Sequence, residues 1–244
     1  MNTKRKQVLK ELGLTPLWRI KSDYLANHAV TQTHSYIKNQ HKKPPSAIKT
    51  DEARYADILK MDWDKLINSV TNCKACPLNQ TRTQTVFGIG DQHANWMYIG
   101  EGPGAREDAT GEPFVGQAGK LLDNMLTAIG LKRDDQVYIT NIVKCRPPNN
   151  RNPALDEARQ CEPYLARQIA LVKPKLIVAL GKVAAQNLLK RDESISNLRG
   201  RLHEFSGIPL VVTYHPAYLL RTLSAKSKVW EDLCFARATM QSLT

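Results

Sequence analysis

The sequence lacks several features that would point to a membrane or secreted protein. None of its 244 residues belongs to an apolar run of about 18 residues, the length that a membrane-spanning helix needs. The N-terminal stretch MNTKRK has no apolar core of the kind found in secretion signals. We therefore expect a cytoplasmic protein, in which cysteines serve as thiols or metal ligands more often than as disulfides.

Two common nucleotide-binding motifs are also missing. The glycine-rich stretch GEGPG at residues 100–104 does not match G-x-G-x-x-G, and no acidic residue follows at a strand end about 20 positions later. The P-loop pattern G-x4-G-K-[ST] does not occur. These absences disfavour a dinucleotide-binding fold. The stretch is then either a turn that lets the backbone approach a ligand or an ordinary tight turn with solvated carboxylates.

Positive charge is abundant and unevenly distributed. The chain has 35 Lys and Arg against 23 Asp and Glu, a net charge of +12. Residues 1–50 hold ten basic and two acidic residues, a net of +8, and include Pro44 and Pro45. We predict a basic arm and linker over 1–50 and one folded domain over 51–244. Such an arm could bind nucleic acid by counterion release. A protein partner and a merely solvating tail are the alternatives.

Beyond the first cysteines, strand and helix patterns alternate. Strands are expected at 95–100, 137–143, 175–180 and 209–214, and helices at 117–129, 153–172, 182–190 and 226–243. This alternation predicts a three-layer α/β/α fold around a central, mostly parallel four-stranded sheet.

Ahead of the sheet, one amphipathic helix is expected to begin at Arg54 and to lead to Cys73. Its apolar positions are Trp63, Leu66, Ile67 and Val70.

Residue types suited to binding or catalysis follow four of the expected strands. They are the GEGPG stretch, Asn141, Gly181 and the pair His215-Pro216. Ligands bind outside the carboxyl ends of the strands in sheets of this kind. The sequence therefore predicts a site at that edge of the sheet.

Four of the five cysteines form a possible ligand set. Cys73 and Cys76 make a C-x2-C pair, Cys145 lies in KCRPP, and Cys161 follows after 15 residues. Four thiolates from distant segments suit a tetrahedral zinc or an iron–sulfur cluster, and the spacing does not choose between them. Scattered buried thiols are the alternative. Cys234 is interpreted as an ordinary helix residue.

Three motifs, in this order, resemble those of the family 4 (iron–sulfur) uracil-DNA glycosylases. They are GEGPGARED with GEPFVGQAG at 100–119, ITNIVKCRPP at 139–148 and YHPA at 214–217. With the cysteines, the resemblance covers about two-thirds of the chain and excludes the arm. It implies a uracil-DNA glycosylase-like fold. It also implies a [4Fe–4S] cluster on the four cysteines Cys73, Cys76, Cys145 and Cys161.

The function implied by the resemblance is hydrolytic excision of uracil from DNA, with the nucleotide flipped out of the stack. We accordingly expect a monomer associated with the bacterial nucleoid that acts on single- or double-stranded DNA. Phe114 would stack on the base beside the backbone of Gly102. The amide of Asn141 would pair with uracil O4 and N3–H, and cytosine presents the reverse pattern. His215 would donate to uracil O2, where negative charge develops.

Two carboxylates could activate water or stabilise the sugar cation. They are Glu101 and Glu107, because this chain lacks the aspartate that family 1 enzymes carry beside the position of Gly102. Glu107 could instead crowd the C5 position of the base and exclude thymine. No lysine occupies a motif position suited to Schiff-base attack, so a monofunctional enzyme that leaves an abasic site is expected. Leu219, Leu220 and Arg221 would wedge into the duplex and contact phosphate.

Two other functions remain open from the sequence. The first is a metal-stapled nucleic-acid-binding module without glycosylase activity. The second is a related glycosylase that bonds covalently to uracil-DNA, which is distinguished by an inserted basic loop with an extra histidine. Residues 147–153 contain no histidine, which disfavours the second.

Overall fold

The structure is a computed structural model that describes the fold of residues 47–243 and the side chains from residue 51 onward. Nearly all of the predicted arm lies outside these residues, so its binding to nucleic acid or protein stays a prediction. Within the described part, no helix combines the length and apolar character needed to cross a membrane.

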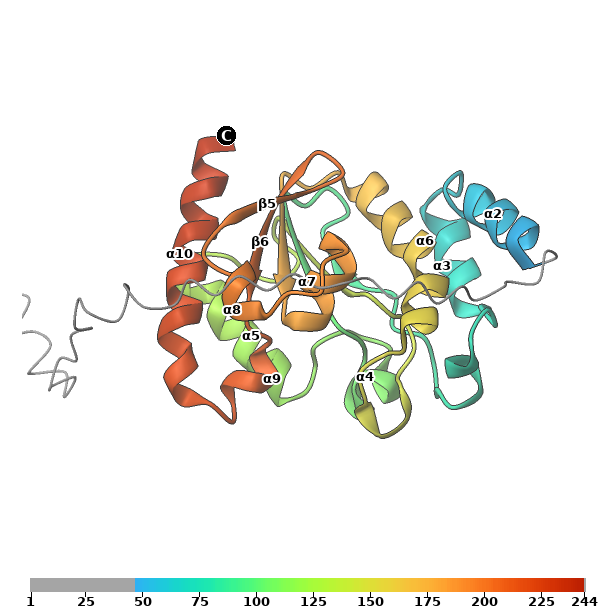
Figure 1. Ribbon diagram of the computed structural model, residues 1–244, viewed down its shortest axis with the longest axis horizontal. Coiled ribbons are helices and arrows are strands. Elements are labelled where there is room, and N and C mark those ends of the chain that lie inside the picture. Colours follow the sequence, from blue (N-terminus) through green and yellow to red (C-terminus); the bar gives the residue numbers. More distant parts are fainter. Residues whose placement is uncertain (1–46, 244) are drawn as a thin grey trace, which may run out of the picture. The chain divides into compact units, whose positions relative to one another are not determined.

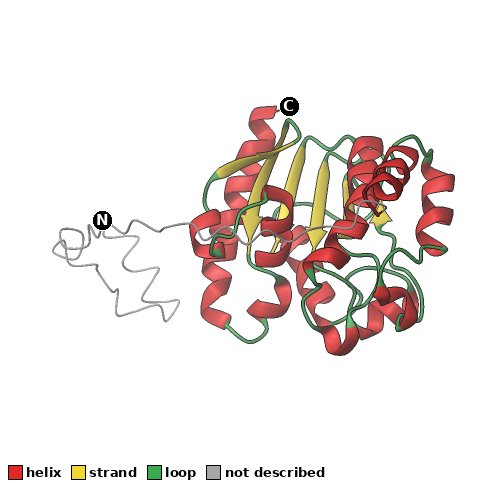
Figure 2. Ribbon diagram, turned by 45° about the vertical axis from the view of Figure 1, so that its right-hand side comes forward, coloured by secondary structure: helices red, strands yellow, loops and turns green. Residues whose placement is uncertain are grey.

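A six-stranded sheet forms the centre of the fold (Figure 2), in the order β1-β3-β2-β4-β6-β5. The inner strands are β3 (Val137–Asn141), β2 (Trp96–Gly100), β4 (Leu176–Leu180) and β6 (Ile208–Thr213). They are parallel to one another, as predicted. The edge strands β1 (Ile89–Gly90) and β5 (Leu202–Phe205) are antiparallel to their neighbours.

The prediction of four strands was therefore short by these two edge strands. β1 has only two residues, too few for a recognisable pattern. β5 has no buried residue, and its Leu202 is 52% exposed, so the strand has no apolar run to reveal it.

Helices cover both faces of the sheet (Figure 1), which confirms the three-layer α/β/α architecture. One face packs against α6 (Leu155–Val172) and α7 (Lys182–Leu189), and the other against α5 (Gln117–Ala128) and α10 (Lys226–Leu243). Shorter helices are α4 (Ala105–Thr110), α8 (Ile195–Leu198) and α9 (Pro216–Leu219), with 3-10 turns η2 (Pro77–Gln80), η3 (Pro148–Asn150) and η4 (Leu223–Ala225).

The prediction of a single helix from Arg54 is wrong. Two helices occupy this region, α2 (Ala47–Ile58) and α3 (Trp63–Thr71). Asp62 separates them because its carboxylate caps α3, accepting a hydrogen bond from the backbone N–H of Lys65 at 2.9 Å. Leu66 and Val70 face the core as expected, whereas Ile67 is 38% exposed.

The order of the inner strands determines where a ligand can bind. The chain moves from β2 to β3 on one side and then returns to place β4 and β6 on the other. Such a reversal leaves a crevice at the carboxyl ends of β2 and β4.

Candidate active site

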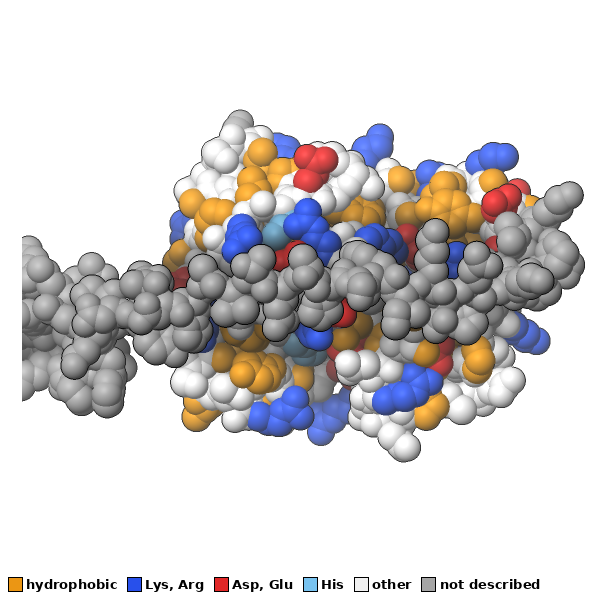
Figure 3. All heavy atoms as spheres, viewed as in Figure 1, with side chains coloured by type: hydrophobic (Ala, Val, Ile, Leu, Met, Phe, Trp, Pro, Cys, Tyr) orange, Lys and Arg blue, Asp and Glu red, His pale blue; other side chains and the backbone are white. Residues whose placement is uncertain are grey.

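A cavity of about 450 Å³ opens at the carboxyl ends of the inner strands. The structure brings together seven of the predicted site residues around it: Glu101, Gly102, Glu107, Phe114, Asn141, His215 and Arg221. Figure 3 shows Lys and Arg side chains along both the upper and the lower edge of the molecule, and two arginines, Arg151 and Arg221, are among the residues that line the cavity. The cavity therefore combines a sheltered interior with cations near its mouth.

Asn141 ends β3 and presents an unusual buried amide. The residue is only 1% exposed, and its Oδ1 has no hydrogen-bond partner among the described residues. A buried acceptor without a partner is unfavourable by about 1–3 kcal/mol, which a ligand N–H can recover. A Cβ at Gly100 would lie 2.5 Å from this Oδ1 and 2.5 Å from Phe114 Cζ. Only glycine at position 100 leaves room for both side chains.

Phe114 forms one wall of the cavity and lies against His215, with ring centroids 5.5 Å apart at 29°. Its backbone is left-handed, with φ 56, a conformation that is strained for a bulky residue. Arg133 stabilises this conformation by donating to the carbonyl of Phe114 at 2.6 Å and to that of Pro113 at 3.0 Å. Gly119 packs directly on the same carbonyl, where a Cβ would overlap it.

His215 caps α9 at the end of the loop after β6. The backbone N–H of Ala217 donates to its Nδ1 at 3.1 Å, which places the proton of the neutral ring on Nε2. Burial lowers the pKa of His215 to about 4, although the carboxylate of Glu107 opposes that shift. At neutral pH the imidazole is therefore uncharged, with Nε2–H as the group that can donate.

The two carboxylates differ in their surroundings. Oε1 of Glu107 accepts hydrogen bonds from the backbone N–H groups of Val115 and Gly116, at 3.0 and 2.9 Å. Glu107 therefore fixes the loop that carries Phe114. Burial raises the pKa of the Glu101 carboxyl, and no described residue donates a hydrogen bond to that carboxylate. Glu101 is thus the carboxylate left available to a water molecule.

The loop after His215 differs in part from its prediction. Leu219 is only 1% exposed and packs in the core, so it is not placed to enter a duplex. Leu220 is 46% exposed, and Arg221 lines the cavity. Tyr218, which sequence reasoning missed, also lines it and stacks on Tyr214 with centroids 5.1 Å apart.

The segment 147–152 contributes further lining residues that sequence reasoning missed, namely Pro147, Asn150, Arg151 and Asn152. Asn149 and Asn150 both have left-handed backbones. The composition PPNNRNP indicates a turn with such residues. It does not indicate that the turn folds back over the cavity.

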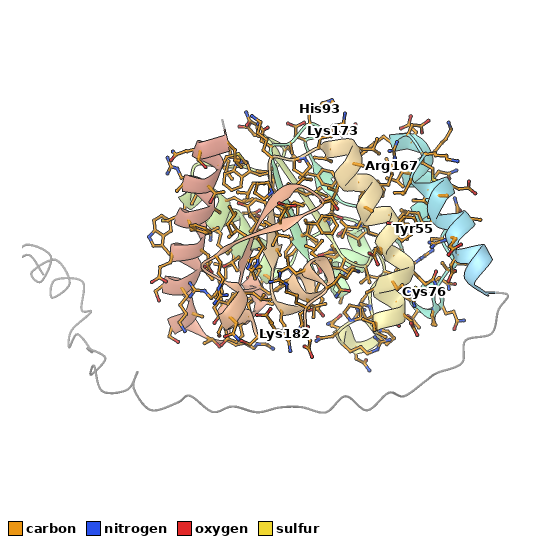
Figure 4. The ribbon with its side chains drawn as sticks, turned by 45° about the horizontal axis from the view of Figure 1, so that its top comes forward. Tyr55, Cys76, His93, Arg167, Lys173 and Lys182 are labelled. Carbon is orange, nitrogen blue, oxygen red and sulfur yellow. The ribbon has the colours of Figure 1, made fainter. Side chains whose placement is uncertain are left out.

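The four predicted ligand cysteines line one small cavity between η2, the loop after β3 and α6, whereas Cys234 is exposed on α10. Figure 4 shows Cys76 beside α6. Burial is the main cause that raises the pKa of Cys161 to about 12, and the neighbouring thiols add to the increase. Among residues 47–243, no three His, Cys, Asp or Glu side chains form a group that could hold a metal ion as they stand.

Cations surround these thiols. Arg82 Nη1 lies 2.9 Å from Cys145 Sγ, and Arg54 Nη2 lies 3.9 Å from Cys73 Sγ. Lys144 adds a third positive group, whose pKa falls to about 7 through burial and is raised by Cys161 and Cys145. Three basic side chains therefore lie beside the four thiols, and such neighbours favour the thiolate form over the thiol.

The chain is similar to known proteins over most of its length. Residues 87–234 match the family model of the uracil DNA glycosylase superfamily. The chain is 42% identical to the type-4 uracil-DNA glycosylase of Pyrobaculum aerophilum over 181 residues, which cover 71% of this chain and 92% of the relative. It is 44% identical to the type-4 enzyme of Archaeoglobus fulgidus over 64% of this chain and 82% of the relative. The type-4 enzyme of Thermotoga maritima is also 44% identical, over 67% of this chain and 87% of the relative.

Proposed function

Because the chain belongs to the uracil-DNA glycosylase superfamily, we propose that it hydrolyses the N-glycosidic bond of deoxyuridine in DNA and leaves an abasic site for repair. The observation that carries the proposal is the buried Oδ1 of Asn141, which has no partner among the described residues and belongs to the cavity that Phe114 and His215 also line. That acceptor suits the N3–H of uracil.

Base selection follows from the lining of the cavity. A flipped uracil would stack on Phe114, accept from Asn141 Nδ2 at O4 and donate N3–H to Oδ1. Cytosine presents an acceptor at N3 and a donor at N4, so both contacts would become repulsive. Gly102 lines the cavity, so its backbone would face the base, and a Cβ at this position would meet Val143 Cγ2 at 2.8 Å.

Bond cleavage divides between two residues. His215 Nε2–H donates to O2 of the departing base, where negative charge grows, an effect worth about 3–4 kcal/mol in comparable sites. Glu101 orients the attacking water and stabilises the positive sugar. Glu107 supports Phe114, and its proximity to His215 also suits the exclusion of thymine. Leu220 and Arg221 contact the DNA strand at the mouth.

Cys73, Cys76, Cys145 and Cys161 would hold a [4Fe–4S] cluster. A cluster binds each thiolate through a different iron, so its ligands need not converge on one point as the ligands of a single zinc do. When bound there, such a cluster would cross-link η2, the loop after β3 and α6. Glycosidic hydrolysis transfers no electrons, so the proposed chemistry requires only His215, Glu101 and the groups that select the base.

The cluster leads to a prediction about the cysteines. Protein purified without oxygen should be brown and should contain iron and acid-labile sulfide. Cys145→Ser should lose most of the sulfide and much of the soluble yield. Cys234→Ser, the matched control on the surface of α10, should retain both. Stoichiometric zinc without sulfide in the unmodified protein would overturn the assignment.

The proposed activity is tested with labelled oligonucleotides that contain uracil, thymine or cytosine at one position, followed by alkali, which cleaves abasic sites. Cleavage at uracil alone is the expected result. Binding without cleavage at any base would instead favour a nucleic-acid-binding module. A complex with uracil-DNA that survives denaturation would indicate the covalent type of glycosylase.

A further inference from the structure

Lys144 lies between the base-recognition residue and the thiols. It is 1% exposed, follows Asn141 by three residues and directly precedes Cys145. Its ammonium turns back toward the end of β3, where Nζ donates to Thr140 Oγ1 at 2.6 Å and to the backbone carbonyl of Asn141 at 2.8 Å. The side chain thus closes the turn that carries Asn141.

The main chain of Lys144 contacts a different part of the structure. Its N–H lies close enough to the thiol of Cys161 to lower the pKa of that group, and its carbonyl accepts a hydrogen bond from the N–H of Val86 at 2.8 Å. One residue therefore joins a ligand cysteine on α6 to the end of the strand that recognises the base.

A buried ammonium is unfavourable by several kcal/mol unless anions or oxygen atoms compensate its charge. Two oxygens provide part of the compensation, Thr140 Oγ1 at 2.6 Å and the carbonyl oxygen of Asn141 at 2.8 Å. Lys144 also directly precedes Cys145, and thiolates bound to metal are anionic. A thiolate centre on these cysteines would therefore help to compensate the cation that holds Asn141.

Asn141 depends on this backbone support. Its Oδ1 contacts no donor among the described residues, so no hydrogen bond at that atom orients the amide before a base arrives. Its direction is set by the main chain, through the bond from Ile142 N to Gly100 O and the bond from Lys144 Nζ to Asn141 O. A shift of the carbonyl would turn the amide away from the base.

We propose that Lys144 is a positioning residue that couples the thiolate centre to base recognition by fixing the main chain of Asn141. This inference rests on the proposed function. It predicts that loss of the ammonium weakens recognition of uracil while the metal centre and the general affinity for DNA remain.

The test compares two duplexes, one with a non-cleavable deoxyuridine analogue and one with a stable abasic analogue. Their affinity ratio reports base recognition without catalysis. Lys144→Met, which keeps the chain length and removes the charge, should lower this ratio about tenfold or more, since small misplacements in a site have such effects. Its iron and sulfide content and its affinity for the abasic duplex should match the wild type.

Arg82→Met is the matched comparison. Arg82 also contacts Cys145 Sγ, but its other hydrogen bonds go to the carbonyls of Cys73 and Thr71, away from Asn141. This variant should lose sulfide, and any loss of base recognition should scale with that loss. Thr140→Val, which removes one acceptor of the ammonium, should lower the affinity ratio with full sulfide, and it decides the matter if Lys144→Met is insoluble.

Three results separate the inference from the proposed function. A wild-type protein with no preference for the uracil analogue would refute the proposed function. A wild-type preference that persists in a sulfide-replete Lys144→Met or Thr140→Val would overturn the role of Lys144. A recognition loss in Lys144→Met that only follows its sulfide loss would also overturn it, because Lys144 would then act on the metal centre alone.

Discussion

Replacing His215 by alanine should slow single-turnover excision of uracil about a hundredfold or more and leave DNA affinity nearly unchanged. The imidazole lines the cavity, and its Nδ1 accepts from the N–H of Ala217, so Nε2–H is the donor that remains for the base. Its contribution arises as charge moves onto the leaving uracil, and binding of the intact substrate does not require it. Rates measured with enzyme in excess over labelled DNA, alongside equilibrium binding, separate the two effects.

The low pKa of His215 leads to a prediction about how the excision rate depends on pH. Because the pKa of His215 lies near 4, the ring is neutral across the range from about pH 5.5 to 8, and the rate should show no step at about 6.5, the usual pKa of histidine. His203→Ala is the control, since that ring bonds to Leu198 O on another part of the chain and should leave the rate unchanged. Wild-type excision rates in His215→Ala would show that His215 takes no part in catalysis.

The sequence predicted the inner strands and much of the site for a common physical reason. Strands buried on both faces are continuous apolar runs, and the residues that follow them share one edge of the sheet. The sequence alone could therefore predict that Asn141 and His215 lie in the same site. The edge strand β5 could not be found in this way, because its pairing with β6 depends on backbone hydrogen bonds and not on burial.

The roles of residues that depend on contacts between distant segments could not be predicted from the sequence. Glu101 and Glu107 lie in the same motif, and the sequence does not distinguish their roles. The structure does, because the loop that contains Val115 and Gly116 donates hydrogen bonds to Glu107. Leu219 and Leu220 are adjacent and chemically identical, yet one is buried against the core and the other is exposed. The left-handed backbone of Phe114 likewise depends on Arg133, which lies in a different connection.

Asn141→Asp should lower excision of uracil by about a hundredfold at neutral pH and create excision of cytosine at lower pH. An ionised carboxylate offers acceptors only, so it repels uracil O4 and cannot serve cytosine N3. A protonated carboxyl offers one donor and one acceptor, which match cytosine N3 and N4–H. Burial at position 141 disfavours the charged form, so protonation should begin above the ordinary pKa of aspartate.

The sign of the pH effect distinguishes recognition from simple damage. General inactivation by acid would lower the release of both bases, so cytosine and uracil release are measured in the same Asn141→Asp preparation between about pH 5 and 8. Cytosine release should rise as the pH falls, because only the protonated acid pairs with it. Asn141→Ala, which has neither donor nor acceptor, should lose uracil excision without gaining cytosine excision at any pH. Unchanged uracil excision in Asn141→Asp, with no cytosine release across this range, would show that residue 141 does not read the base.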